Sequence, residues 1–212
     1  MKPGMAWRWR GAIRTLLGAA LLLAGAGCAL QTTRDQPATY DFGPPPAQHA
    51  TARVPAAVLI VPVSAPSWLD SNAIVYRLNY DDPARRRVYA ESRWAATPAA
   101  LFTQRLRNRF ALSARAVLTP GDQADAAYAL QVDLDDFSQS FGAPGTSQVN
   151  LQLRASLIDL DNHRLVAQKN FSLQRTAPTP DAPGAVSALA AAAEQAANEL
   201  VGWVSSVLKR RK

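Results

Sequence analysis

The chain carries its only cysteine, Cys28, directly after a short apolar run that follows a basic head. Four positive side chains precede this run: Lys2, Arg8, Arg10 and Arg14. The apolar stretch from Leu16 to Ala24 is too short to span a bilayer comfortably, and the small residues at 25–27 allow a signal peptidase to cut before Cys28. The pattern predicts a lipoprotein signal peptide over residues 1–27, although Gly25 stands where bacterial lipoprotein signals usually carry leucine.

Attachment of a diacylglycerol to the Cys28 thiol through a thioether, and of an acyl group to the amine freed by cleavage, would give the mature protein three acyl chains, and we expect no cofactor beyond this lipid. Two acyl chains already hold a protein firmly on a membrane, so three make release negligible. Because the lipid consumes the thiol, no disulfide can form, and stability must come from burial of a core. Ala29 stands where aspartate commonly signals retention in the inner membrane, so we expect the periplasmic face of the outer membrane.

The formal net charge of +7 belongs to the two ends of the chain. Eight of the 23 lysines and arginines lie in the signal segment or in the basic tail at 209–212, so residues 28–208 carry 15 positive and 16 negative side chains. A near-neutral body does not attract a polyphosphate, which argues against a nucleic acid as partner. We interpret the tail as a solvated end that complements the negative terminus of the preceding helix, with contact to anionic headgroups as the alternative.

Glutamine, threonine, proline and alanine dominate residues 28–55, which predicts a lipidated N-terminus followed by a flexible tether. As a random coil, this segment reaches roughly 30 Å and would hold a domain clear of the headgroups. Tyr40–Gly43 could instead form a short edge strand, because the prolines that follow suit only an edge.

Hydrophobic patterns predict one α/β (α+β) domain at residues 56–208. Ala57–Val63 is a continuous apolar run, typical of a strand covered on both faces. Further strands are expected near 74–80, 87–93, 116–119, 130–135, 149–157 and 165–175, the last three forming a meander with one polar face. Thr97 caps an expected helix to about Ser113, and an alanine-rich helix follows at 186–208. We predict two or three layers, with a mixed, mostly antiparallel sheet and two main helices.

The residues that could carry chemistry are few. His49 lies in the tether and His163 in a tight turn at 161–164, so neither is placed to activate a nucleophile. Asp133, Asp135 and Asp136 resemble half of a carboxylate metal site, but two of them project from the solvent face of an alternating strand. We therefore expect no metal ion and no enzymatic activity.

A set of short segments in a fixed order carries a resemblance to a known family. They are Ile60–Val63, Ser67–Asp70, Ile74–Arg77, Glu91–Ala95 and Leu130–Phe137. Together with Cys28, this set resembles the ABC-type transport auxiliary lipoprotein family (PqiC-like), although Ala96–Ala99 departs from the acidic residue and Pro-Leu pair usual there. The resemblance implies a non-enzymatic outer-membrane lipoprotein, assembled as a homo-oligomeric ring, that docks the outer-membrane end of a lipid conduit. Its implied partners are an MCE-domain protein and an inner-membrane ABC permease and ATPase.

The motif residues can serve packing or docking. We expect Trp94 to staple the helix after Thr97 to the sheet, and Trp68 with Leu69 to cover the end of a buried strand, with docking as the alternative. Asp70 and Arg93 are candidates for an ion pair across the sheet end. A second class of function fits the same anchor, tether and domain: a periplasmic lipoprotein cofactor of a peptidoglycan synthase or of an outer-membrane assembly machine.

Overall fold

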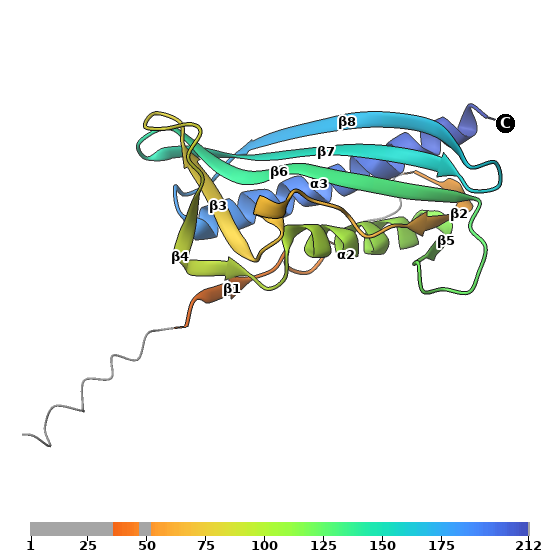
Figure 1. Ribbon diagram of the computed structural model, residues 1–212, viewed down its shortest axis with the longest axis horizontal. Helices are drawn as coiled ribbons and strands as arrows, with labels where there is room; N and C mark the ends of the chain where they lie inside the picture. Colours follow the sequence, from red (N-terminus) through yellow and green to blue (C-terminus); the bar gives the residue numbers. More distant parts are fainter. Residues whose placement is uncertain (1–35, 47–51, 212) are drawn as a thin grey trace, which may run out of the picture. The chain divides into compact units, whose positions relative to one another are not determined.

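One long strand organises the domain. The computed structural model describes residues 36–46 and 52–211, and β6 (Tyr128–Ala143) runs along most of its length (Figure 1). One edge of β6 pairs antiparallel with β7 (Thr146–Asp159), which pairs antiparallel with β8 (Arg164–Thr176). The other edge of β6 pairs in parallel with β2 (Val54–Ile60) near its start and with β3 (Ala73–Leu78) near its end. Two strands that are far apart along the same edge thus share β6 as their partner.

The remaining strands extend the sheet from β2 and β3. β5 (Ala114–Leu118) lies parallel to β2, β4 (Arg87–Trp94) forms the predicted hairpin with β3, and β1 (Ala38–Tyr40) lies parallel to the end of β4. The result is one eight-stranded mixed sheet in which the long pairings, β6 with β7 and β7 with β8, are antiparallel. The predicted fold class, a single α+β domain with a mixed, mostly antiparallel sheet and two main helices, is confirmed.

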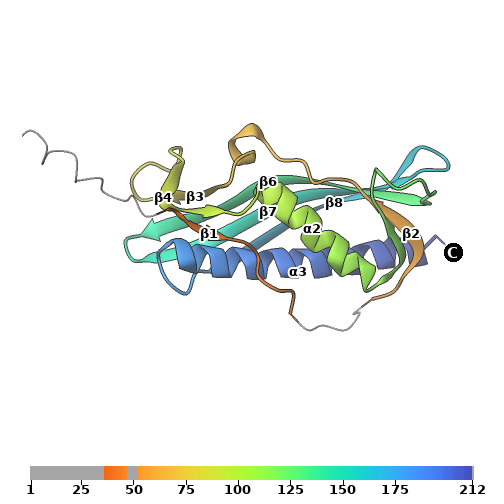
Figure 2. The ribbon, with the colours of Figure 1, turned by 90° about the horizontal axis from the view of Figure 1, so that it is seen from below.

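Both helices cover the same face of the sheet, so the domain has two layers (Figure 2). α2 (Pro98–Ala111) begins at Thr97, whose hydroxyl accepts the Ala100 N–H, and it buries Phe102, Leu106 and Phe110 as the periodicity predicts. α3 (Ala182–Lys209) packs on β7 and β8 through a face rich in small side chains. The fully buried members of that face include Ala185, Ala192, Ala193, Ala196 and Ala197, which let the helix approach the sheet closely. No helix among the described residues is long and apolar enough to cross a bilayer.

Three sequence predictions need correction. β2 is not covered on both faces: Ala57 and Leu59 are half-buried while Val58 and Ile60 are fully buried, because both helices lie on one side. The basic tail is not simply a solvated end, since Lys209 is still in α3 and Arg211 donates to Asp159 at 3.2 Å. The third correction concerns the tether.

Part of the segment predicted as a tether belongs to the domain. Ala38–Tyr40 forms β1, which shares only Tyr40 with the alternative edge strand predicted at Tyr40–Gly43, and Phe42 is only 8 % exposed within the core. The compact unit accordingly begins at Pro37. Composition predicts a coil here because the surrounding residues are polar or proline. The aromatic side chains of Tyr40 and Phe42 nevertheless pack on the core, and the apolar area that they bury stabilises an ordered segment. Cys28 and its signal segment lie outside the described residues.

We predict that Gly184→Ala destabilises the domain. Asp181 caps α3 by accepting the Gly184 N–H at 2.8 Å, and a methyl group at residue 184 would overlap the Thr179 carbonyl oxygen. Gly202 lies in the same helix with nothing within 4 Å of an added methyl group. Gly202→Ala is therefore the control and should raise the free energy of unfolding by about 0.5–1 kcal/mol through helix propensity. Denaturant unfolding measures both variants, and equal stabilisation by the two would contradict the clash at residue 184.

Candidate functional site

Trp94 ends β4 inside an aromatic cluster. Its side chain is 1 % exposed, and its ring centroid lies 5.6 Å from Phe42 and 5.7 Å from Phe137. Phe42 and Phe137 also meet each other at 5.6 Å. Trp94 is thus buried, and two of its neighbours in this cluster are an aromatic ring of the N-terminal segment and one of β6.

A buried arginine fixes the same N-terminal segment against both helices. The Arg105 guanidinium, on α2, donates to the carbonyl oxygens of Phe42 (2.9 Å) and Gly43 (2.8 Å) and to the Glu194 carboxylate on α3 (3.0 Å). The side chains of Arg105 and Glu194 are 7 % and 12 % exposed. We name these four residues the N-terminal clamp, because they join α2, α3 and the N-terminal segment through one side chain.

The clamp shortens the tether. Eight residues, 29–36, separate Cys28 from the start of the compact unit. A flexible chain of that length spans roughly 16 Å, about half the reach of the tether expected from composition.

Sequence reasoning missed the clamp, although it left a signal. Arg105 lies between Phe102 and Leu106 on the apolar side of α2, where a charged residue requires a partner. Phe42 follows Asp41, whose carboxylate accepts the Gly43 N–H at 2.7 Å in a turn typical of Asp-x-Gly. Neither feature alone identifies the other, because 63 positions separate Phe42 from Arg105.

Of the other motif residues, Trp68 lies beside arginines of the β3–β4 hairpin. Trp68, in the short 3-10 turn Ser67–Leu69, is half-buried, whereas Leu69 is 1 % exposed. The Arg86 guanidinium stacks 4.1 Å from the Trp68 ring centroid, and that of Arg77 lies 6.0 Å away. Trp68 therefore presents an aromatic face that arginines cover.

The pairing considered for Asp70 and Arg93 is wrong. Arg93 is exposed and its Nε lies 3.4 Å from the Thr39 hydroxyl of β1. Asp70 ends the 3-10 turn, with its backbone N–H donating to the Ser67 carbonyl oxygen. Within residues 36–46 and 52–211, no ion pair joins Asp70 and Arg93, because strand β1 occupies the edge that Arg93 faces.

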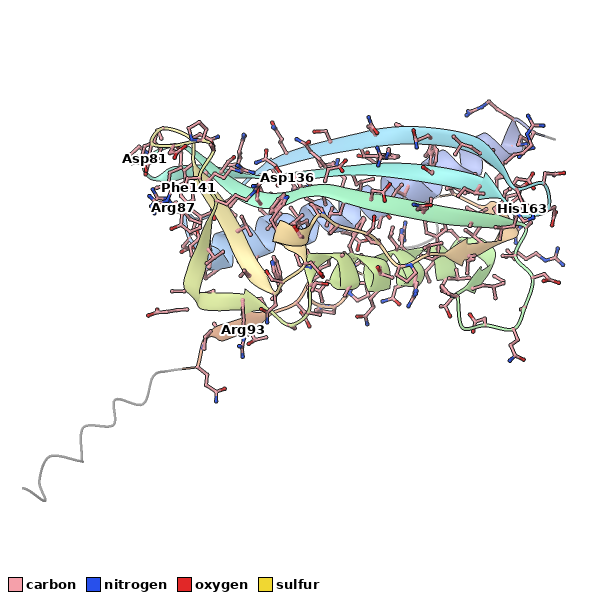
Figure 3. The ribbon with its side chains drawn as sticks, in the orientation of Figure 1. Asp81, Arg87, Arg93, Asp136, Phe141 and His163 are labelled. Carbon is pink, nitrogen blue, oxygen red and sulfur yellow. The ribbon has the colours of Figure 1, made fainter. Side chains whose placement is uncertain are left out.

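The three aspartates of β6 have separate surroundings, and Asp135 is exposed to solvent. Asp133 pairs with Arg154 of β7 at 3.2 Å and accepts the Ser64 hydroxyl. Burial raises the pKa of Asp136, while the Ser138 hydroxyl and the Arg77 guanidinium act in the opposite direction. Asp136 lies part-way along β6, whereas His163 lies at the end of the molecule opposite the β3–β4 hairpin (Figure 3). Among the described residues, no three His, Cys, Asp or Glu side chains gather in a group suited to a metal ion.

A polar network crosses the sheet beside the hairpin. The Tyr89 hydroxyl donates to Gln139 Oε1 at 2.6 Å, and Gln139 Nε2 donates to the Ser147 hydroxyl at 2.7 Å. Burial raises the pKa of Tyr89 to about 12, so the phenol stays protonated and keeps donating. Gln139 is fully buried, and the network ties β4, β6 and β7 together.

The fold is one that known structures share. The crystal structure of protein XCC0632 from Xanthomonas campestris, a DUF330 protein, matches with a TM-score of 0.66 at 23 % identity, over 83 % of this chain and 95 % of that one. An uncharacterised protein matches with a TM-score of 0.59 at 13 % identity, over 81 % of this chain and 100 % of that one. The hypothetical protein CT253 from Chlamydia trachomatis matches with a TM-score of 0.50 at 10 % identity, over 71 % and 96 %. These likenesses define the fold class.

The family follows from the sequence itself. The model of the ABC-type transport auxiliary lipoprotein component matches residues 40–201, so the chain belongs to this family, as the motif resemblance indicated. The match begins at Tyr40 and therefore includes Phe42 of the clamp. No curated protein sequence matches the chain.

We predict that Trp94→Ala lowers the free energy of unfolding by roughly 3–5 kcal/mol, because it opens a cavity between Phe42 and Phe137. Thermal unfolding measures the loss. Trp68→Ala is the matched control and should cost clearly less, since Trp68 is only half-buried. Unchanged melting of Trp94→Ala together with loss of self-association would contradict a packing role and favour a docking role.

Proposed function

We propose that this chain is an outer-membrane lipoprotein, held by lipid on Cys28, that serves as the non-enzymatic auxiliary component of an ABC/MCE-type lipid transport system. The family match over residues 40–201 carries the proposal, because the family is an auxiliary component of ABC-type transport. The domain docks the outer-membrane end of the conduit, with an MCE-domain protein as its direct partner. Copies of the chain form the ring that receives the conduit.

The architecture supports a docking role without catalysis. The side chains of Trp94, Phe42 and Arg105 are buried, so they stabilise a rigid domain. A short tether limits how far a rigid domain can move from its membrane, and this is useful for a component that must meet a conduit. Such a role needs only surface complementarity, whereas catalysis needs a cluster of activated groups.

A cross-linked pull-down of the full-length chain from intact cells tests this function. We expect an MCE-domain protein, an ABC permease and an ATPase to be enriched together. Cys28→Ala is the control: it lacks the acceptor for the lipid, so it should remain an unprocessed precursor and lose the partners. Enrichment of a peptidoglycan synthase or an outer-membrane assembly machine instead would contradict the proposal. Cleavage of Cys28→Ala before residue 28, with recovery in the outer membrane, would contradict the anchor.

A further inference from the structure

The end of the domain opposite β1 has a hollow with an apolar floor and a basic rim. It measures about 520 Å³ and lies between the C-terminal end of α3 and the start of β8. Val166, Ala167 and Val207 line the floor, and Leu165 stands at its edge with 59 % of its surface exposed. Three guanidinium groups surround it, those of Arg164, Arg210 and Arg211.

Most of the positive charge at this hollow is not neutralised. Arg211 pairs with Asp159, the one carboxylate that lines the hollow, and Asp159 also accepts from Asn162 at 3.1 Å. Among the described residues, the guanidinium groups of Arg164 and Arg210 take part in no ion pair or hydrogen bond. The C-terminus of α3 contributes only about half a negative charge, so the rim remains cationic.

The neighbouring surface has the same sign. Arg53 and Arg115 line a second hollow at the starts of β2 and β5, and the Ser205 hydroxyl of α3 donates to the Arg53 carbonyl oxygen at 2.8 Å. On the other side, the outer edge of β8 pairs with no strand among the described residues. An extended segment laid there can therefore gain main-chain hydrogen bonds in addition to ionic contacts.

We propose that this hollow binds an extended acidic segment of a partner protein, with carboxylates on Arg164 and Arg210 and an apolar side chain against Leu165 and Val207. The proposal rests on the anchor at Cys28, which is part of the proposed function. α3, with its 28 residues, is about 42 Å long and runs from the β1 end of the domain to this hollow (Figure 1). A short tether at the β1 end leaves the hollow facing away from the anchoring membrane unless the domain lies flat on it. A protein is therefore the favoured source of the acidic groups.

Fluorescence anisotropy with the full lipidated chain in detergent tests the proposal. The probe is a labelled hexapeptide of alternating glutamate and leucine, and its counterpart carries glutamine in place of glutamate. We expect the glutamate peptide to bind and the glutamine peptide to bind at least tenfold more weakly. Arg164→Gln and Arg210→Gln should each weaken binding of the glutamate peptide roughly tenfold, the effect of one charged hydrogen bond.

Arg85→Gln is the charge-matched control, because Arg85 is exposed on the β3–β4 hairpin at the other end of the domain. It should leave binding unchanged. No binding of the glutamate peptide, or an equal loss in all three variants, would overturn the proposal. A second measurement uses vesicles of phosphatidylglycerol and phosphatidylcholine. If the chain binds these vesicles through Arg164 and Arg210 but does not bind the glutamate peptide, the hollow is a membrane-binding site and the proposal is overturned. The assay contains no transport component, so a negative result leaves the pull-down outcome intact.

Discussion

The arrangement of the N-terminal segment, α2 and α3 depends on the hydrogen bonds and the ion pair that the Arg105 guanidinium makes. Removing a charge from water costs several kcal/mol, and a buried pair recovers this only when its remaining hydrogen bonds are made. Arg105 meets that condition with three acceptors, Glu194 and the carbonyl oxygens of Phe42 and Gly43. The N-terminal segment is thus a required partner of a buried charge, and its loss would leave two donors of Arg105 unsatisfied.

The aromatic cluster and the clamp act on the same few residues from opposite sides. Phe42 packs its ring on Trp94 and Phe137 while its carbonyl oxygen receives Arg105. Backbone pairing adds a third restraint, since the Ala95 N–H donates to the Tyr40 carbonyl oxygen at 2.6 Å. These restraints determine where the N-terminal segment enters the domain.

Much of the fold was predictable because its periodicities are clear. Buried and more exposed residues alternate over 130–135 of β6 and 146–155 of β7, and α2 and α3 have caps at Thr97 and Asp181 that local chemistry explains. The parallel pairings of β2 and β3 with the two halves of β6 were not predictable, since parallel partners lie far apart in sequence and no turn fixes their register. The clamp was missed for the same reason: each half looks ordinary until the fold brings Arg105 to Phe42.

Of the motif residues, burial of Trp94 could be argued from its place before the Thr97 cap. The ion pair between Asp70 and Arg93 was predicted wrongly because the composition of residues 38–40 did not indicate strand β1, which pairs with β4 at Arg93.

The N-terminal segment from Pro37 onward is part of the domain. Site-resolved hydrogen exchange of the Ala95 amide tests it most directly, because this N–H is bonded to Tyr40 of β1. We expect protection in the native protein comparable to that of the β3–β4 ladder, and its loss in Arg105→Gln while β6 and β7 stay protected. An Ala95 amide that exchanges at the rate of an open amide in the native protein would contradict the account.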